Sequence, residues 1–593
     1  MEENCHYYKM FGFNRKFKST ERRPPPDVTD AFSLCTSSES QMSPDHFRRF
    51  LIEFQGEEEV TIDDAKRTME LLLRRFRPNF SLCSFTLDDF FNYLILDDLN
   101  GPIPSEVRHD MTAPLHHYFI YTGHNSYLTG NQLYSDCSEV PIIKALHKGV
   151  RVIELDLWPN SAKDGIHVLH GRTMTTPVRP SKCLKSIKEH AFVKSPYPVI
   201  ITLEDHLTPN LRAKFAEMAT EIFGDMLYCL KTGDSDEFPS PEELKHHIIL
   251  STKPPKEYLE SKLEEELVVG EETPYGCKSG NPTDETMSSN QDDNMSNLNQ
   301  NLSQFMDFED EDGDVGDEKP GEKTPPEYIQ LIGIHAAKAK KGLRNALKVA
   351  SGKGKRLSLG EQNLERAADL YGTDLVRFTQ KNFVRVFPKG TRVTSTNFKP
   401  LLAWMHGAQM VASNMQGYGR SLWMMHGMFR SNGGCGYVKK PDFLMRRGPN
   451  NEVFDPKATL HVKKTLKVKV YMGDGWHIDF KQTHFDTYSP PDFYTKMYMV
   501  GVPADVTEKK TRVIKNDWTP IWDEEFTFPL TVPELALLKI VVRDNDVSEK
   551  DDFAGQTCLP VSELRSGIRS VPLHNEKGDK LQSVKLLMRF AFE

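Results

Sequence analysis

The chain has 593 residues, of which 38% are apolar and 10% aromatic, so it can form several packed cores and wholesale disorder is excluded. Its formal net charge of −9, from 84 acidic and 75 basic residues, at first argues against nucleic acid or an anionic membrane as a partner. That charge is concentrated, however, because nine acids and one lysine lie between residues 307 and 322. The rest of the molecule is close to neutral, and its basic residues remain able to contact anionic partners.

The nine cysteines are scattered and include no Cys-x-x-Cys pair, so the sequence predicts neither a disulfide framework nor a zinc cluster. The first residues lack the apolar core of a signal peptide, and no apolar run approaches the roughly 18 to 20 residues of a membrane span. We therefore expect a soluble protein of the reducing cytosol.

The first 108 residues read as a tail followed by helices. Residues 1–27 are polar, basic and aromatic and predict a flexible tail. Residues 28–108 predict an EF-hand-like helical module, with helices that begin after Ser43, Thr61 and Thr86. No Asp-x-Asp-x-Asp-Gly loop separates these helices, so we interpret the module as a packing element and not as a calcium sensor.

Residues 109–255 alternate between short apolar strands and amphipathic helices, which predicts a parallel sheet covered by helices. Both a (β/α) barrel and an open doubly wound sheet fit this pattern. No Gly-x-Gly-x-x-Gly follows the first strand, which excludes a dinucleotide-binding variant.

Three further segments complete the chain. Residues 256–326 are rich in Ser, Asn, Asp, Glu and Gly and predict an acidic disordered insert. Strand and helix patterns resume over 327–445, so the insert interrupts one domain. Residues 446–593 alternate with period two and predict an antiparallel β-sandwich.

Polar residues recur where the predicted parallel strands end. His124 and Asn125 follow the first strand, Glu154 and Asp156 end the second, His170 ends the third and Glu204 ends the fourth. In parallel α/β folds this edge is where sites are built. Three carboxylates forced together repel one another unless a cation or proton intervenes, and an all-oxygen ligand set suits calcium or magnesium. Two histidines beside such an ion can exchange protons near neutral pH.

Structural roles are the alternative for the same residues. A strand-end histidine is more often hydrogen-bonded than catalytic, and Arg151 or a lysine could form salt bridges with Glu154 and Asp156. The recurrence at four consecutive strands favours a site.

Several motifs together make the chain similar to a known family. They are residues 110–119 (DMTAPLHHYF), 123–130 (GHNSYLTG), 153–158 (IELDLW), 170–171 (HG), 199–204 (VIITLE), 387–392 (FPKGTR) and 432–441 (NGGCGYVKKP). These segments resemble eukaryotic phosphoinositide-specific phospholipase C, and the step from a short tail to a helical module without a pleckstrin-homology domain resembles the plant branch. The resemblance implies a distorted (β/α)8 TIM-type barrel split by the insert into X and Y halves (109–255 and 327–445), then a C2-type sandwich.

The resemblance also implies roles for the strand-end residues. Asn125, Glu154, Asp156 and Glu204 match the ligands of one catalytic Ca²⁺, and His124 and His170 match the two catalytic histidines. The implied reaction is calcium-dependent hydrolysis of phosphatidylinositol 4,5-bisphosphate and related lipids, through a cyclic inositol phosphate, to diacylglycerol and inositol 1,4,5-trisphosphate. Glu154 or Glu204 would take the proton of the attacking hydroxyl.

Substrate contacts follow from the same correspondence. Lys253, Ser358 and Arg385 fall where the family binds ring phosphates, and Ser251 replaces a second lysine found in animal relatives. Phe387 replaces the usual tyrosine under the ring, so a hydrogen bond is lost. In animal enzymes of the family, the rim of the barrel enters the lipid. Here Leu133 and Met174 at the rim are apolar, whereas Arg172 and Thr391 occupy positions where aromatic residues occur in the family.

The terminal sandwich resembles a C2 domain. Its predicted loops carry aspartates that could hold two or three Ca²⁺ and bridge to anionic phospholipid: Asp486, Asp492, Asp544, Asp546 and Asp552. Phosphoinositide substrate and an anionic membrane are the expected partners, nucleic acid is not, and the expected location is the inner face of the plasma membrane. Two alternatives are a catalytically weak, calcium-dependent membrane scaffold and a glycerophosphodiester phosphodiesterase.

Charge adds one hypothesis about regulation. Between residues 331 and 360 the chain carries eight lysines and arginines and no acid. We expect the neighbouring acidic insert to be repelled by anionic lipid and to cover the mouth of the barrel, unless the basic tract is simply a solvated helix face.

Overall fold

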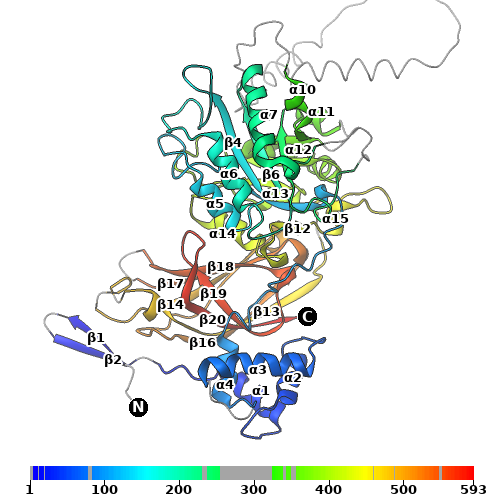
Figure 1. Ribbon diagram of the computed structural model, residues 1–593. Coiled ribbons are helices and arrows are strands. Elements are labelled where there is room, and N and C mark those ends of the chain that lie inside the picture. Colours follow the sequence, from blue (N-terminus) through cyan, green and yellow to red (C-terminus); the bar gives the residue numbers. More distant parts are fainter. Residues whose placement is uncertain are drawn as a thin grey trace, which may run out of the picture. The chain divides into compact units, whose positions relative to one another are not determined.

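The computed structural model describes residues 5–10, 13–18, 20–77, 83–229, 237–253, 324–337, 342–348, 355–458, 460–481, 483–486, 488–546 and 550–593. It divides into two compact units (Figure 1). One contains Met1–Asp110, Thr396–Gly407 and Met415–Glu593, and the other Met111–Ser395 and Ala408–Asn414. Within these described ranges no helix is long and apolar enough to cross a bilayer. The acidic insert lies almost wholly outside them, so the hypothesis that it covers the active site stays a prediction.

Eight parallel strands form the barrel of the second unit, in the order β8, β7, β6, β4, β3, β11, β10, β9. A parallel bridge between Ala336 and Arg356 joins the two ends of this sheet and closes it. The structure therefore confirms the predicted barrel and excludes the open doubly wound sheet. The strands are β3 (Tyr118–Gly123), β4 (Val152–Pro159), β6 (Val199–Asp205), β7 (Ile248–Thr252), β8 (Ile332–His335), β9 (Arg356–Gly360), β10 (Phe383–Phe387) and β11 (Met410–Ser413).

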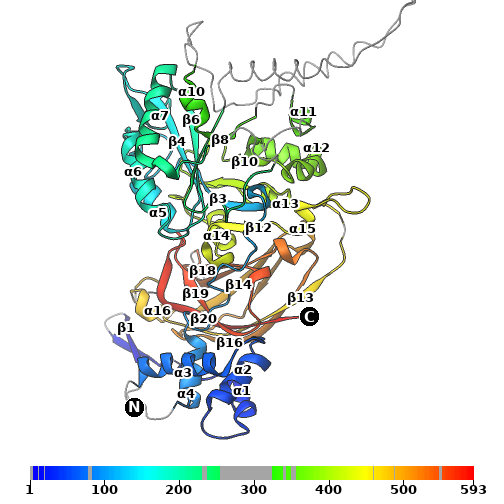
Figure 2. The same cartoon turned by 45° about the vertical axis from the view of Figure 1, so that its right-hand side comes forward.

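Helices flank the barrel strands in this unit, and Figure 2 shows the same arrangement from a second side. The strands are buried along nearly their whole length, which is why they read as continuous apolar runs in the sequence. A short antiparallel strand, β5 (Ile166–Val168), extends the end of β4 and distorts the barrel there. The helices are α5 (Val140–His147), α6 (Pro180–His190), α7 (Pro209–Phe223), α10 (Pro326–Gln330), α11 (Leu343–Lys348) and α12 (Glu361–Thr379).

An antiparallel sandwich forms the largest part of the first unit, as predicted. Its strand order is β15, β14, β17, β18, β19, β20, β13, β16, and the pair Gln556 and His574 joins β18 to β19. Alternate residues of these strands, such as Leu466, Val468 and Val470, fill one apolar core. The strands are β13 (Lys464–Asp474), β14 (Phe493–Val500), β15 (Thr507–Lys510), β16 (Ile521–Leu530), β17 (Leu537–Asp544), β18 (Phe553–Pro560), β19 (Gly567–His574) and β20 (Lys580–Phe592).

Shorter elements of the same unit include α14, which packs against β18. A Cβ at Gly427 would lie 2.6 Å from Cys558 Cβ, so only glycine allows this close approach. The elements are α13 (Leu401–Met405), α14 (Arg420–Met428), β12 (Tyr437–Lys439), α15 (Asp442–Met445) and α16 (Trp476–Asp479).

The helical module of the first unit has the paired arrangement of EF-hands. Its helices are α1 (Pro26–Thr36), α2 (Pro44–Glu53), α3 (Ile62–Phe76) and α4 (Leu87–Ile95). Capping boxes at Ser43, Thr61 and Thr86 start the last three, as the sequence predicts. The two inter-helix connections are joined by an antiparallel bridge between Met42 and Phe85.

The prediction of a flexible tail is wrong for residues 5–10 and 13–18, which form two strands. Strands β1 (Cys5–Met10) and β2 (Phe13–Lys18) form an antiparallel hairpin. The hairpin is held because Tyr8 is only 2% exposed and its hydroxyl accepts a hydrogen bond of 3.0 Å from Trp518 Nε1. Composition alone suggested a tail because the residue that Tyr8 packs against lies some five hundred positions away.

A buried ion pair joins the helical module to the sandwich and predicts a large stability effect. The side chain of Arg569 is 0% exposed and donates to Glu57 Oε1 at 2.7 Å and to Gln55 O at 2.8 Å. We expect Arg569→Ala to lower the free energy of unfolding by about 3 kcal/mol, because it leaves buried acceptors unpaired. The exposed pair of Arg512 and Glu524 supplies the control, since Arg512→Ala should cost less than about 1 kcal/mol. Equal effects in urea unfolding would contradict this account.

Candidate active site

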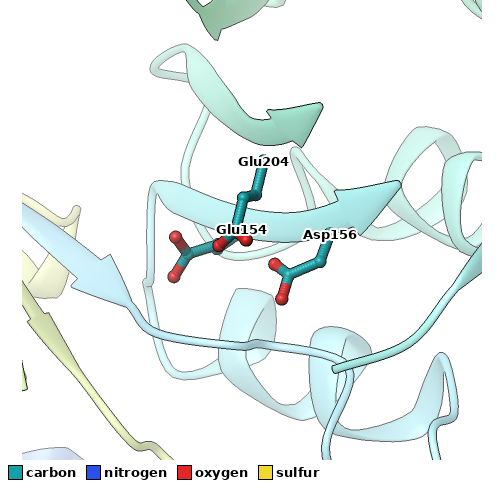
Figure 3. A group of neighbouring side chains, drawn as sticks. All are labelled: Glu154, Asp156 and Glu204. Carbon is teal, nitrogen blue, oxygen red and sulfur yellow. The ribbon is translucent and has the colours of Figure 1, made fainter. Parts of the chain in front are cut away.

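Three carboxylates converge at the carboxyl ends of two neighbouring barrel strands. Glu154 and Asp156 lie two residues apart on β4, and Glu204 on β6 pairs in register with Asp156. Each offers an oxygen within 4.8 Å of the others, and Figure 3 shows them together. The strand-end placement predicted from the sequence thus brings all three side chains to one point.

The crowding of the carboxylates shifts the pKa of Asp156. Burial, and then the charges of Glu204 and Glu154, raise the pKa of its carboxyl well above the usual value. Its Oδ2 accepts a hydrogen bond of 2.6 Å from the hydroxyl of Tyr127, while its buried Oδ1 has no hydrogen-bond partner. A buried carboxylate oxygen without a hydrogen-bond donor has the chemistry of a ligand to a cation.

Glu154 is neutralised by an arginine from the other half of the barrel. Burial alone would raise its pKa, but the guanidinium of Arg385, in an ion pair with Oε1, holds the pKa below the usual value. Its Oε2 also accepts a hydrogen bond of 3.1 Å from the backbone of Asn125. Arg151 instead donates to backbone carbonyls, including Ala191 O at 2.6 Å, so the alternative that it pairs with Glu154 is not supported.

His124 and Asn125 follow β3 at the same end of the barrel. The Nδ1 of His124 lies 2.9 Å from Asn414 Oδ1 and donates to it, which leaves Nε2 as the nitrogen available to a substrate. Burial lowers the pKa of His124 to about 4, and Glu154 opposes the shift. Asn125 has a left-handed backbone with φ of 41°, which asparagine tolerates, and its Nδ2 donates to Gln132 at 2.9 Å.

Gln132 connects these groups to the second histidine. Its backbone carbonyl lies 2.6 Å from Nδ1 of His170, which fixes this imidazole with Nε2 free. Its side-chain amide donates to Asn414 Oδ1 at 3.1 Å and to Ser395 Oγ at 2.8 Å. One residue therefore orients both histidines and the amide of Asn125.

These side chains fit a hard divalent cation. The three carboxylates make an all-oxygen donor set, and the buried Oδ1 of Asp156 that has no hydrogen-bond partner belongs to it. The role of Asn125 as a fourth ligand stays a prediction. His206 donates to Glu204 Oε1 at 2.7 Å, and its ring stacks on Trp158 with centroids 3.7 Å apart. Such second contacts fix ligand orientation.

A second acidic group lies on loops of the sandwich. Asp486, Asp544 and Asp546 also offer oxygens within 4.8 Å of one another. Burial raises the pKa of Asp544 to about 7, and its Oδ2 is buried without a partner. Asp492 and Asp552 adjoin the group, since the backbone of Asp492 donates to Asp544 and Asp552 accepts from the backbone of Asp544.

Comparison with known proteins identifies the family to which the chain belongs. Models of the phosphatidylinositol-specific phospholipase C X domain, its Y domain and the C2 domain match residues 111–254, 334–443 and 464–575. The Arabidopsis thaliana protein phosphoinositide phospholipase C 6 is 57% identical, with 100% of this chain and 98% of the relative covered. The chain belongs to the phosphoinositide-specific phospholipase C family.

Other members of this phospholipase C family match over most of their length. Phosphoinositide phospholipase C 4 of Arabidopsis thaliana is 54% identical over 98% of this chain and 97% of the relative. Human 1-phosphatidylinositol 4,5-bisphosphate phosphodiesterase delta-1 is 30% identical over 96% of this chain and 72% of that protein. The crystal structure of S. officinalis PLC21 shares the fold, with a TM-score of 0.72, 22% identity and coverage of 96% of this chain and 68% of that one.

The expected substrate residues lie on three strands of the barrel. Arg385 on β10 pairs in register with Ser358 on β9, and its guanidinium lies 5.3 Å from the centre of the Phe387 ring. Lys253 follows the end of β7 and is half-buried. The guanidinium of Arg385 forms an ion pair with Glu154, so a ring phosphate that binds Arg385 would share the guanidinium with Glu154 or displace that carboxylate.

Sequence reasoning missed Arg356 and Gln132 as parts of the site. Arg356 is 5% exposed and donates to Ser251 Oγ at 2.9 Å and to Thr202 Oγ1 at 3.3 Å. It therefore supplies a positive charge beside Ser251. In the sequence Arg356 belongs to the basic tract of residues 331–360, but its position two residues before Ser358 on one strand gives both side chains the same face.

Asp156 offers a test of the repulsion between carboxylates. We expect Asp156→Asn to raise the free energy of unfolding in chelator by about 1 kcal/mol, the scale of one unit of pKa shift, because it removes a buried like charge. The rise in thermal midpoint caused by calcium should be smaller than in the parent. Asp225→Asn, at an exposed position, is the control for both measurements. A variant that is destabilised in chelator, or stabilised fully by calcium, would refute this reading.

Gln132 offers a test of positioning. We expect Gln132→Leu to lower kcat for phosphoinositide hydrolysis by about 10- to 100-fold with little change in KM, because the orienting amide is lost while the substrate contacts remain. Gln362→Leu, at an exposed position of α12, is the matched control. A parallel loss of thermal stability with kcat unchanged would show a purely structural role.

Proposed function

We propose that this protein hydrolyses phosphatidylinositol 4,5-bisphosphate and related phosphoinositides, in a calcium-dependent reaction, to diacylglycerol and inositol 1,4,5-trisphosphate through a cyclic inositol phosphate. The observation that carries the proposal is the buried carboxylate group flanked by two oriented histidines at one end of the barrel. Membership of the family supplies the reaction class, and the names of its relatives supply the substrate class.

The attacking hydroxyl needs a base beside it. One calcium ion, held by Asn125, Glu154, Asp156 and Glu204, would lower the pKa of the inositol 2-hydroxyl and offset phosphate charge. Glu154 would take the hydroxyl proton, because its ion pair with Arg385 keeps the carboxylate ionised. The oxygen then attacks the neighbouring phosphorus.

The histidines act on the phosphate and the leaving group. His124, with Nδ1 anchored on Asn414, would stabilise the pentacoordinate phosphorus by donating from Nε2 as an imidazolium, because the negative charge of a bound phosphate favours the protonated ring. Nε2 of His170, with Nδ1 anchored on the carbonyl of Gln132, would give a proton to the departing glycerol oxygen. The neutral imidazole left behind would then take a proton from the water that opens the cyclic phosphate.

The ring phosphates would be held by the cationic wall of the barrel. Arg385, Lys253 and Ser358 are the proposed contacts, and Arg356 adds a buried positive charge next to Ser251. Phe387 would stack under the inositol ring without the hydrogen bond of a tyrosine.

Contact with the membrane would involve both units. In the C2 domain, Asp486, Asp492, Asp544, Asp546 and Asp552 would hold two or three Ca²⁺ and bridge to anionic phospholipid. On the barrel, Leu133, Tyr134 and Met174 are 40%, 67% and 77% exposed, and the backbone of Met174 donates to Leu133 O at 2.8 Å. Leu133 and Tyr134 follow Gln132 in sequence, and all three exposed side chains suit shallow insertion into a bilayer. They support our proposal that the protein binds peripherally to the inner face of the plasma membrane.

One assay tests the function directly. We expect release of water-soluble inositol phosphate from phosphatidylinositol 4,5-bisphosphate vesicles with calcium, no release in chelator, and about 10³-fold less release from His124→Ala. His147→Ala, at an exposed position on α5, should retain parental activity. Calcium-dependent vesicle binding without hydrolysis by the parent would favour the scaffold alternative, and release unaffected by His124→Ala would overturn the mechanism.

A further inference from the structure

The outer face of the sandwich carries basic and aromatic side chains on neighbouring strands. Along β14 alternate residues point to opposite faces of the sheet, and one set, which includes Met497, fills the apolar core. The other set lies on the outer face, where Tyr498 is paired with Lys539 of β17. On the same strand, Lys496 is paired with Lys510 of β15. Paired residues share a face, so these four side chains belong to one surface.

Two of these lysines are held by aromatic rings. The ammonium of Lys539 lies 4.0 Å from the centre of the Tyr498 ring. The ammonium of Lys510 lies 3.6 Å from the centre of the ring of Tyr494, which is on the same face of β14. An aromatic ring orients an ammonium group without neutralising its charge, and no acid in the described part of the chain forms an ion pair with either lysine. We call these residues, together with Lys496, the lysine–tyrosine face.

Lys539 is the most enclosed of the three lysines of this face. It is 6% exposed, and α14, which packs against β17 and β18, covers Cys558, the residue opposite Lys539 on β18. Burial, and then the charge of Arg420 at the start of α14, lower the pKa of Lys539 to about 8. Lysines are almost never this buried without an anionic partner, so the ammonium has the surroundings of an anion site. Lys496 contributes less, since Glu508 pairs with it at 3.5 Å.

The lysine–tyrosine face ends at the loops that carry the acidic group of the sandwich. Tyr494 is paired with Arg543, which directly precedes Asp544 of that group. The hydroxyl of Tyr494 donates to the carboxylate of Asp551, and Arg543 donates to the backbone carbonyl of Asp551 at 2.7 Å. Figure 1 shows α14 on the β18 side of this sheet. A ligand on the face would therefore lie beside the loops that we propose to hold Ca²⁺.

We propose that the lysine–tyrosine face, together with Arg420, is a second binding site for the phosphate monoesters of inositol head groups, distinct from the barrel site. Lys510 and Lys539 would donate to phosphate oxygens, whose negative charges would offset the two ammonium groups. The choice of inositol phosphates rests on the proposed function, because the membrane substrate and the soluble product both carry them. The phosphate monoester is the chemistry that these two sources share, and separate probes distinguish them.

Binding of the full-length protein in calcium chelator tests the proposal, since chelator should stop hydrolysis and remove any calcium bridge to lipid. The soluble probe is inositol 1,4,5-trisphosphate, followed by calorimetry. The membrane probe is phosphatidylcholine vesicles that contain phosphatidylinositol 4,5-bisphosphate. Lys539→Met should weaken binding of at least one probe by about tenfold, because it removes a charge-assisted hydrogen bond and keeps a side chain of similar length. A loss with the trisphosphate alone identifies the soluble product as the ligand, and a loss with the vesicles alone identifies the lipid.

Variants of β15 and the stability of the protein supply the controls. Lys509→Gln removes a charge from a position that is paired with Met497 and lies on the opposite face, so it should bind both probes as the parent does. Lys510→Gln, on the lysine–tyrosine face, should weaken binding severalfold. The thermal midpoint of Lys539→Met without ligand should equal or exceed that of the parent, because a buried charge without an acidic partner is lost.

Three results would overturn the inference. The first is equal binding of both probes by Lys539→Met and Lys509→Gln. The second is the same loss on vesicles in which phosphatidylserine supplies an equal charge, which would indicate general attraction to anionic lipid. The third is slower hydrolysis of a monomeric short-chain phosphoinositide in calcium by Lys539→Met than by the parent. A parent that does not hydrolyse this substrate contradicts the proposed function, whereas the binding measured in chelator is judged separately.

Discussion

The repulsion among Glu154, Asp156 and Glu204 is the constraint around which the barrel site is organised. Two unit charges about 4 Å apart repel by roughly 4 kcal/mol at an effective dielectric constant of 20, so three buried carboxylates cannot stay together unaided. The protein offsets part of this cost with the guanidinium of Arg385, the hydroxyl of Tyr127 and the ring of His206. The buried oxygen of Asp156 that has no hydrogen-bond donor is where, in our proposal, a divalent cation would offset the rest of the repulsion.

The same constraint explains why the two halves of the barrel are interdependent. Glu154 is neutralised by a residue 231 positions away, and Gln132 bonds to residues 263 and 282 positions away. The X half carries all three carboxylates, but Arg385 and Asn414 of the Y half neutralise Glu154 and orient His124. A long insert between the halves is tolerated because the entropy cost of closing a loop grows only slowly with its length.

Crowded carboxylates occur a second time at the edge of the sandwich, where they suit lipid binding instead of proton transfer. The difference lies in the neighbours. Histidines and an arginine surround the barrel group, whereas Asp544 ends strand β17 and Asp486 and Asp546 lie on loops next to it. In the function that we propose, one physical principle, the affinity of repelling acids for a cation, serves catalysis in one unit and membrane attachment in the other.

The sequence by itself determined the alternating barrel strands, the period-two sandwich, the capped helices and the strand-end positions of Glu154, Asp156, Glu204, His124 and His170. These features follow from local periodicity and from the rule that parallel strands end at one edge. Only the tertiary structure decided that the sheet closes, that Arg385 pairs with Glu154, that Gln132 and Arg356 belong to the site, and that the first residues form a docked hairpin. Most of these features depend on contacts between residues far apart in the sequence, such as Tyr8 with Trp518, and local patterns carry no information about such partners.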